Sequence, residues 1–195
     1  MSTERRTFFA GRLWPTVAAV AVILVATALV LHGEGRLWIC ACGRILLWAG
    51  NVCSPDNSQH LLDPYSFTHI LHGFAFCGLL ALLAPRVPVH WRLCLAILLE
   101  ALWEVLENSE YVIQRFREAT AALGYQGDTV VNSVGDIAAC ATGFMLARKL
   151  GLWRSLIIFI VTETVLTLWI KDSLILELVM LIHPIDAIKS WQLCH

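Results

Sequence analysis

The sequence predicts an all-α protein, an integral membrane helical bundle with about five transmembrane helices. Of its 195 residues 58% are hydrophobic and only 15% are charged, and the mean hydropathy is +0.69. A soluble domain of this length would usually carry more charge. Several apolar stretches also approach the ~20 residues that a helix needs to cross the hydrocarbon core of a bilayer. We therefore expect a single membrane domain over residues 1–195.

The first predicted span covers residues 13–31 and follows the basic residues Arg5, Arg6 and Arg12. A signal peptide is the competing interpretation of such a segment. This apolar run is longer than the roughly 7–15 residues of a signal-peptide core, and no small-residue cleavage site follows it. We expect an uncleaved span, followed by an outer loop over residues 32–65.

Four further segments have about the length of a membrane-spanning helix. They are residues 66–84, 93–112, 129–147 and 152–170. Two other apolar segments, residues 37–49 and 174–182, are too short to cross and are expected to form interfacial or re-entrant helices. A sixth crossing through residues 174–188 is the alternative for the second of these.

The basic residues predict the orientation in the membrane. Eight of the fourteen lie at the N-terminus or beside the short connections that follow the second and fourth spans, and cytoplasmic loops are enriched in Lys and Arg. These eight are Arg5, Arg6, Arg12, Arg86, Arg92, Arg148, Lys149 and Arg154. We expect a multi-pass protein of the bacterial inner membrane with a cytoplasmic N-terminus and a periplasmic C-terminus.

Three polar clusters interrupt the predicted spans. They are the pair His69 and His72, the series Glu100, Glu104 and Glu107, and the series Asp128, Asn132 and Asp136. The spacing within each cluster places its members on one face of a helix. In the predicted topology all three clusters lie toward the outer surface, so we expect them to line one outward-facing cavity. Ionisable groups at membrane depth cost roughly 2.5–3.5 kcal/mol on insertion scales and usually mark a function.

Negative charge dominates these spans. Carboxylates in or beside them include Glu100, Glu104, Glu107, Asp128, Asp136 and Glu163, and the one Lys or Arg within the five spans is Arg154, at the predicted cytoplasmic end. These carboxylates cannot all remain ionised at low dielectric without a counter-charge. Protons, a metal ion, a cationic substrate, or Arg115 and Arg117 from the following loop could supply it.

Two imidazoles beside carboxylates suit Zn, Mn or Fe. We expect His69, His72 and Glu104 to be the metal ligands, with a second carboxylate activating water. The candidate catalytic residues are Glu104, Glu107, Asp128, Asn132 and Asp136. The alternative is that these groups only join helices through hydrogen bonds, with Asp128 as a helix N-cap. Capping would not explain Asp136, which lies more than two turns further along the helix.

Cys40, Cys42 and Cys53 lie in the predicted outer loop. An oxidising periplasm favours a disulfide there. We expect Cys53 to pair with Cys40 or Cys42, because a direct bridge within Cys-x-Cys is strained. A soft-metal site is the alternative.

Seven short motifs carry a resemblance to a known family. They are Cys40-x-Cys42-Gly43, Asn57-Ser58-Gln59-His60, His69-x-x-His72-Gly73-Phe74, Trp103-Glu104-x-x-Glu107-Asn108-Ser109, Tyr125-x-Gly127-Asp128, Asn132-Ser133-x-x-Asp136 and Met180-Leu181-Ile182-His183-Pro184. From Cys40 onward the chain resembles uncharacterised protein family 0314, also called domain of unknown function 2585. The resemblance implies a multi-pass bacterial inner-membrane protein and implies no activity. Cys53 is not part of the family pattern. A fainter likeness to VanZ-like membrane proteins rests on the Gly-Asp, Asn and Asp run that opens a helix.

Three functions agree with these features. The first is a metal-assisted membrane hydrolase acting on a lipid or cell-envelope intermediate, with membrane lipid and a lipid-linked substrate as partners. The second is a non-catalytic scaffold or lipid-binding protein. The third is a proton-coupled transporter using Glu100 and Glu163, ranked below the enzyme because few polar residues lie in the cytoplasmic half.

The near-neutral charge balance, fourteen basic against fifteen acidic residues, argues against a nucleic-acid partner. The oligomeric state does not follow from the sequence.

The predicted orientation can be tested with reporter fusions. Alkaline phosphatase fused after His195 should be active, because that end is expected in the periplasm, and a fusion after Pro88 should be silent. Activity at Pro88 together with silence at His195 would place the polar cavity on the cytoplasmic side.

Overall fold

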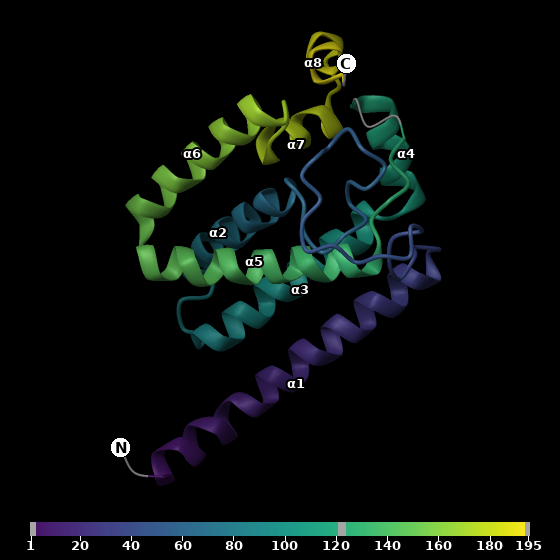
Figure 1. Cartoon of the computed structure of the whole chain (residues 1–195). Coiled ribbons are helices and arrows are strands. Elements are labelled where there is room, and N and C mark those ends of the chain that lie inside the picture. Colours follow the sequence, from purple (N-terminus) through teal and green to yellow (C-terminus); the bar gives the residue numbers. More distant parts are fainter. Residues whose placement is uncertain (1–2, 121–123, 194–195) are drawn as a thin grey trace.

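The computed structural model describes residues 3–120 and 124–193 (Figure 1). Within these residues the chain forms eight helices and no strand, so the predicted all-α class is confirmed. The helices are α1 (Thr3–Gly33), α2 (Ser66–Leu83), α3 (Val89–Glu107), α4 (Glu110–Ala119), α5 (Val130–Leu150), α6 (Leu152–Trp169), α7 (Leu174–Ile182) and α8 (Asp186–Gln192).

Four helices are long and apolar enough to cross a membrane, namely α1 from Leu13, α2, α5 and α6. The predicted span over residues 93–112 is wrong in its bounds, because α3 ends at Glu107 and α4 starts at Glu110. Ser109 separates them by capping α4, its hydroxyl accepting the Val112 N–H at 3.4 Å. At 19 residues α3 is still about 28 Å long. It returns the chain from the end of α2 to the end where α5 begins (Figure 1).

The predictions for the two short apolar segments, residues 37–49 and 174–182, have different outcomes. Residues 37–49 form no helix, so that prediction is wrong. Their backbone bonds elsewhere in the loop instead: the Ala49 N–H donates to the Leu62 carbonyl at 2.9 Å, and the Leu61 N–H donates to the Leu46 carbonyl at 3.1 Å. Residues 174–182 do form the short helix α7. A sixth crossing through residues 174–188 is wrong, because α7 ends at Ile182 and the seven-residue α8 starts separately at Asp186.

The centre of the bundle is the contact between α2 and α5, the most extensive in the protein. Glycines allow the two backbones to approach closely. A Cβ atom on Gly73 would lie 2.1 Å from the Cys140 carbonyl oxygen, and one on Gly143 would lie 2.0 Å from the Ile70 carbonyl oxygen. Such small-residue contacts are typical of helix packing in membranes.

The other long helices surround this pair. On α3, Ala96 packs with Leu80 of α2 and Phe144 of α5. The adjacent Ile97 belongs to a second cluster with Ile137 of α5. Val20, Ile23 and Leu24 of α1 cover the latter cluster from outside. Most of the side chains of α1 and α6 in the described part of their spans remain exposed and apolar, as expected of helices that face lipid.

One end of the bundle is closed by the long loop after α1 and by α7 (Figure 1). The loop caps α5, because the N–H groups of Val130 and Val131 donate to the carbonyls of Leu37 and Trp38 at 2.8 and 3.2 Å. On the other side Glu163 of α6 accepts the backbone N–H groups that begin α7, from Leu174 at 3.0 Å and from residue 175 at 3.1 Å. The short basic connections lie at the opposite end of the bundle.

The close contact between α2 and α5 predicts a sharp difference between two glycines of one helix. Gly73→Ala should destabilise the protein by about 1–3 kcal/mol, because the added methyl group meets backbone that cannot move aside. Gly78→Ala is the matched control: nothing lies within 4 Å of its Cβ position, and alanine favours a helix by about 0.5–1 kcal/mol. Thermal unfolding in detergent measures both, and equal melting temperatures for the two variants would contradict this packing.

Candidate functional site

The polar clusters of α2, α3 and α5 meet at the closed end of the bundle, around a cavity of about 70 Å³. One water molecule needs roughly 10–15 Å³ on this measure, so the cavity has room for several waters or ions. Its lining includes His69, His72, Glu107, Asp128, Asn132 and Asp136, together with Asp172 and Glu177 from the α7 side. The sequence-predicted residues therefore come together, whereas their chemical roles remain predictions.

Glu100 joins the two histidines. Its side chain is fully buried, and its two oxygens lie 2.5 Å from His69 Nδ1 and 3.0 Å from His72 Nδ1. A carboxylate accepts, so Nδ1 of His69 carries the hydrogen and the lone pair of the neutral ring is on Nε2. That nitrogen lies 3.9 Å from Asp136 Oδ2. His72 is therefore hydrogen-bonded to Glu100, and the expected metal ligation by His69, His72 and Glu104 stays a prediction.

Glu104 is the unusual member of the site. It is fully buried, and neither of its carboxylate oxygens has a hydrogen-bond partner among the described residues. Nδ1 of His69 lies 3.4 Å from Glu104 Oε1 but is engaged with Glu100. Glu107 is also buried, and its Oε2 lacks a partner as well. Leaving such groups unsatisfied costs about 1–3 kcal/mol each, and more for charged groups.

Asp128 is not the cap of α5, so the capping part of the structural alternative is wrong, whereas the hydrogen bonds that it expected between segments are present. Thr129 caps the helix, its hydroxyl accepting the Asn132 N–H at 3.3 Å. Asp128 instead accepts hydrogen bonds from Asn108 Nδ2 at 3.0 Å and from the Tyr125 hydroxyl at 2.9 Å. Burial raises the pKa of the Asp128 carboxyl, although these two hydrogen bonds oppose the shift.

Gly127 makes this approach of Asp128 to α3 feasible. Its φ of +88° is in the left-handed region, and a Cβ atom there would lie 3.0 Å from Asn108 Oδ1. Asn108 in turn uses that oxygen to accept the Asp128 N–H at 2.6 Å. Asn108, directly after α3, and Asp128, two residues before α5, are thus joined by two hydrogen bonds.

Asp136 and Asn132 are both buried on α5 but differ in their partners. Asp136 accepts the Ser66 hydroxyl at 2.7 Å, and its second oxygen faces His69. Asn132 donates to the His60 carbonyl at 2.8 Å and to Asp63 at 3.4 Å, so its amide holds the outer loop in place. The geometry gives Asn132 a clear structural role.

Three acidic residues near the site were missed by sequence reasoning. Asp63 lies in the loop and is satisfied by the N–H groups of Ser58 at 3.0 Å and Tyr65 at 2.7 Å. Asp172 and Glu177 line the cavity, and burial raises their pKa values to about 7 and about 8 respectively. Glu177 is the one charged residue in the apolar α7, a signal that could have identified it.

The two arginines named above as candidate counter-charges, Arg115 and Arg117, bind elsewhere. Arg115 donates to the Leu181 carbonyl at 2.9 Å and to the Ile182 carbonyl at 3.3 Å. Arg117 donates to the Tyr125 carbonyl and to Gln126. Among the described residues no Lys or Arg lines the cavity. The counter-charge must therefore come from the histidines, protons or a bound cation.

Three groups of side chains in this region have metal-ligand spacing, with their donor atoms within 4.8 Å of one another: His69 with His72 and Glu100, His69 with Glu104 and Asp136, and Glu104 with Glu107 and Asp128. The first group is already satisfied by its own hydrogen bonds. The other two share Glu104, whose oxygens have no such partner. These nitrogen and oxygen donors suit Zn, Mn or Fe.

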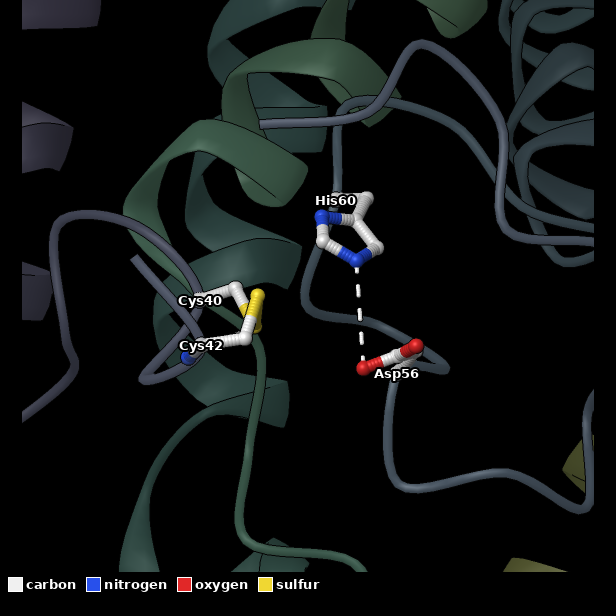
Figure 2. Close-up of side chains that lie close together, drawn as sticks. All are labelled: Cys40, Cys42, Asp56 and His60. Carbon is white, nitrogen blue, oxygen red and sulfur yellow. Dashed lines mark hydrogen bonds and ion pairs between the residues drawn. A yellow bond between two sulfur atoms is a disulfide. The ribbon is translucent and has the colours of Figure 1, made fainter. Parts of the chain in front are cut away.

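A fourth group lies in the loop over residues 32–65 (Figure 2). Cys40 and Cys42 form a disulfide, so the predicted pairing of either with Cys53 is wrong. A turn closed by the Gly43 N–H to Cys40 carbonyl bond, 2.9 Å long, brings the two Cα atoms to 5.1 Å. His60 beside them accepts the Leu46 N–H at Nδ1, so its Nε2 carries a hydrogen and faces Asp56 at 3.9 Å. Bonded sulfurs and a protonated nitrogen do not favour a metal here.

Comparison with known proteins identifies related sequences. The family described as "Protein of unknown function (DUF2585)" matches residues 31–194. A UPF0314 protein of Paracoccus denitrificans is 44% identical over 187 residues, covering 96% of each chain. UPF0314 proteins of Sinorhizobium fredii and Sphingopyxis alaskensis are each 45% identical, covering 92% and 90% of this chain and 91% and 93% of their own. No solved structure matches. These findings do not extend to VanZ-like proteins, and that likeness stays a prediction.

The raised pKa of Asp172 predicts how stability depends on pH. Burial raises this pKa to about 7, from ~3.9 in an unfolded chain, so the folded protein holds a proton that the unfolded chain releases. Stability should therefore fall as the pH rises from about 4 to about 7. Asp172→Asn should make this fall smaller by roughly 2–4 kcal/mol.

Unfolding in detergent at pH 5 and pH 8 measures this difference. Asp186→Asn is the control, because Asp186 is exposed at the start of α8. An unchanged pH dependence in Asp172→Asn would show that Asp172 ionises normally in the folded protein.

Proposed function

The chain belongs to the DUF2585 family of UPF0314 proteins, and we propose that this member is a metal-assisted hydrolase of the bacterial inner membrane. Its substrate would be a lipid or cell-envelope intermediate that reaches the cavity at the outer leaflet. One observation carries the proposal: Glu104 is fully buried among other carboxylates and histidine, and both of its oxygens lack a hydrogen-bond partner in the described chain.

Protonation alone accounts poorly for Glu104. A protonated carboxyl group has a hydroxyl donor and a carbonyl acceptor, and both would still be buried without partners. A cation between Glu104 and its neighbours would satisfy both oxygens and balance the negative charge. The nearest donors are His69 and Asp136 on one side and Glu107 and Asp128 on the other.

The remaining groups fit a hydrolytic reaction. A bound divalent ion lowers the pKa of a coordinated water and polarises a carbonyl or phosphoryl oxygen. Glu177 lines the cavity from α7, and burial raises its pKa to about 8, which favours the protonated carboxyl near neutral pH before an ion binds. It is therefore suited to donate a proton to a leaving group.

The surroundings favour a substrate that comes from the membrane. Trp103, Phe116 and Leu178 contribute apolar surface to the cavity wall beside its acidic groups. Apolar side chains are also widely exposed on the neighbouring long helices, as in a protein surrounded by lipid. A headgroup could thus enter the polar cavity while its acyl chains remain in the bilayer.

The scaffold alternative is supported by a different set of contacts. Glu100 is fully paired with the two histidines, and Asn132 is bonded to the loop, as expected of groups that only hold helices together. The transporter alternative is weakened, because Glu163 accepts two backbone N–H groups of α7 and Glu100 is engaged by both histidines. Glu104 is the residue that separates an enzyme from a scaffold.

Metal analysis of the gently extracted, full-length protein tests the proposal. We expect Zn, Mn or Fe to co-purify, and Glu104→Gln should weaken binding by more than the 10–100-fold that loss of an outer-shell partner typically costs. Glu110→Gln is the control, since Glu110 is exposed on α4. Incubation with bacterial lipid extract, followed by mass spectrometry, should reveal a product that disappears with chelator. Metal-free protein and an unchanged lipid profile would leave the scaffold interpretation.

A further inference from the structure

Two of the metal-ligand groups lie beside the cavity and are neighbours: four of their members line it, and the fifth, Glu104, is buried within 4.8 Å of their donor atoms without being part of the lining. One consists of His69, Glu104 and Asp136, and the other of Glu104, Glu107 and Asp128. They have a single residue in common, and that residue is the buried Glu104. From this arrangement we infer that the cavity holds a dinuclear metal centre bridged by the Glu104 carboxylate. The inference rests on the proposed function and specifies its active centre.

The free oxygens of Glu104 support a bridging role. A carboxylate that binds one ion through one oxygen still needs a partner for the other, and neither oxygen of Glu104 has one among the described residues. Paired catalytic ions lie about 3.5–4 Å apart, a separation that one carboxylate can span. On the far side Glu107 offers a second unpartnered oxygen, Oε2.

The spacing of the donors fits two ions with small adjustments. Ligand atoms about 2.0–2.2 Å from an ion can be at most ~4.4 Å apart. Within each group the donor atoms already lie within 4.8 Å of one another. Shifts below one ångström would therefore bring each set into coordination range.

Charge balance favours two ions over one. The two groups contain four carboxylates, on Glu104, Glu107, Asp128 and Asp136, and one imidazole that is neutral when it binds metal. No Lys or Arg in the described chain lines the cavity. One divalent ion would neutralise half of this negative charge, whereas two would neutralise all of it.

Each side of the centre has its own outer shell of hydrogen bonds. On the first side Glu100 fixes the ring of His69, and the Ser66 hydroxyl fixes Asp136. On the second side Asn108 and Tyr125 both donate to Asp128. Metal ligands are characteristically oriented by such outer-shell partners, and histidine by a carboxylate in particular.

The two-ion centre also indicates the class of substrate. Without cations the acidic cavity would repel a phosphate group. Two ions would attract it, and they would stabilise both the attacking and the leaving oxygen of an in-line displacement at phosphorus. The hydrolysis of a phosphate ester or anhydride of a membrane lipid is the reaction that this centre suits best: water adds to phosphorus, the bond to the leaving oxygen breaks, and that oxygen is protonated.

The stoichiometry of metal binding tests the inference in the intact protein. Metal-free protein in detergent is titrated with Mn²⁺, and bound metal is measured by elemental analysis and by electron paramagnetic resonance. We expect two ions per chain and the spectrum of a magnetically coupled pair. Asp136→Asn and Asp128→Asn should each reduce binding to one uncoupled ion, because each removes a ligand from one side. Glu110→Gln, on exposed α4, should keep both ions.

The possible outcomes separate this inference from the proposed function. One ion per chain, with Asp128→Asn and Glu107→Gln unchanged, would overturn the dinuclear centre and leave a metal-assisted hydrolase intact. Two coupled ions without any chelator-sensitive lipid product would support the centre and contradict the function. No bound metal would overturn both. The wild-type stoichiometry and spectrum decide the question even if a variant fails to fold.

Discussion

The structure depends on one constraint, the burial of several carboxylates in an apolar helical bundle where, among the described residues, no Lys or Arg lines the cavity beside them. Glu100, Glu104 and Asp136 lie on the long helices at low exposure, and Asp128 adjoins them. Each could be removed from water only with hydrogen bonds, a proton or a cation to compensate. The arrangement of the loop and of the short helices follows from how that compensation is distributed.

Part of the compensation is supplied by the fold itself. The histidines of α2 satisfy Glu100, Asn108 and Tyr125 satisfy Asp128, and Glu163 caps α7. Glu104 is left out of these networks, although it lies at their centre. This contrast is the reason for assigning a cation to Glu104: if the cluster only joined helices, Glu104, which is as fully buried as Glu100, would be expected to have partners too.

The sequence predicted the parts of this structure that depend on local pattern. Apolar runs of sufficient length predicted the four long apolar helices close to their observed bounds, and the spacing of acids on α3 and α5 placed them on converging faces.

The predictions that failed concern features that depend on contacts between residues far apart in the sequence. Helix α3 ends at Glu107 where Asn108 bonds to Asp128, twenty positions away, and no local signal indicates this partner. Residues 37–49 form no helix, because their backbone groups are hydrogen-bonded to α5 and to the rest of the loop. The short α7 was predicted, but its folding back over the cavity with Glu177 was not, because it depends on Glu163 of another helix.

Anomalous diffraction from crystals of the gently extracted protein would test the central claim most directly, since it locates a transition metal without reference to activity. The account predicts a peak within coordination distance of the Glu104 carboxylate, about 2.0–2.2 Å from one of its oxygens. A Glu104 side chain hydrogen-bonded only to ordered water, with no anomalous peak in the cavity, would contradict it.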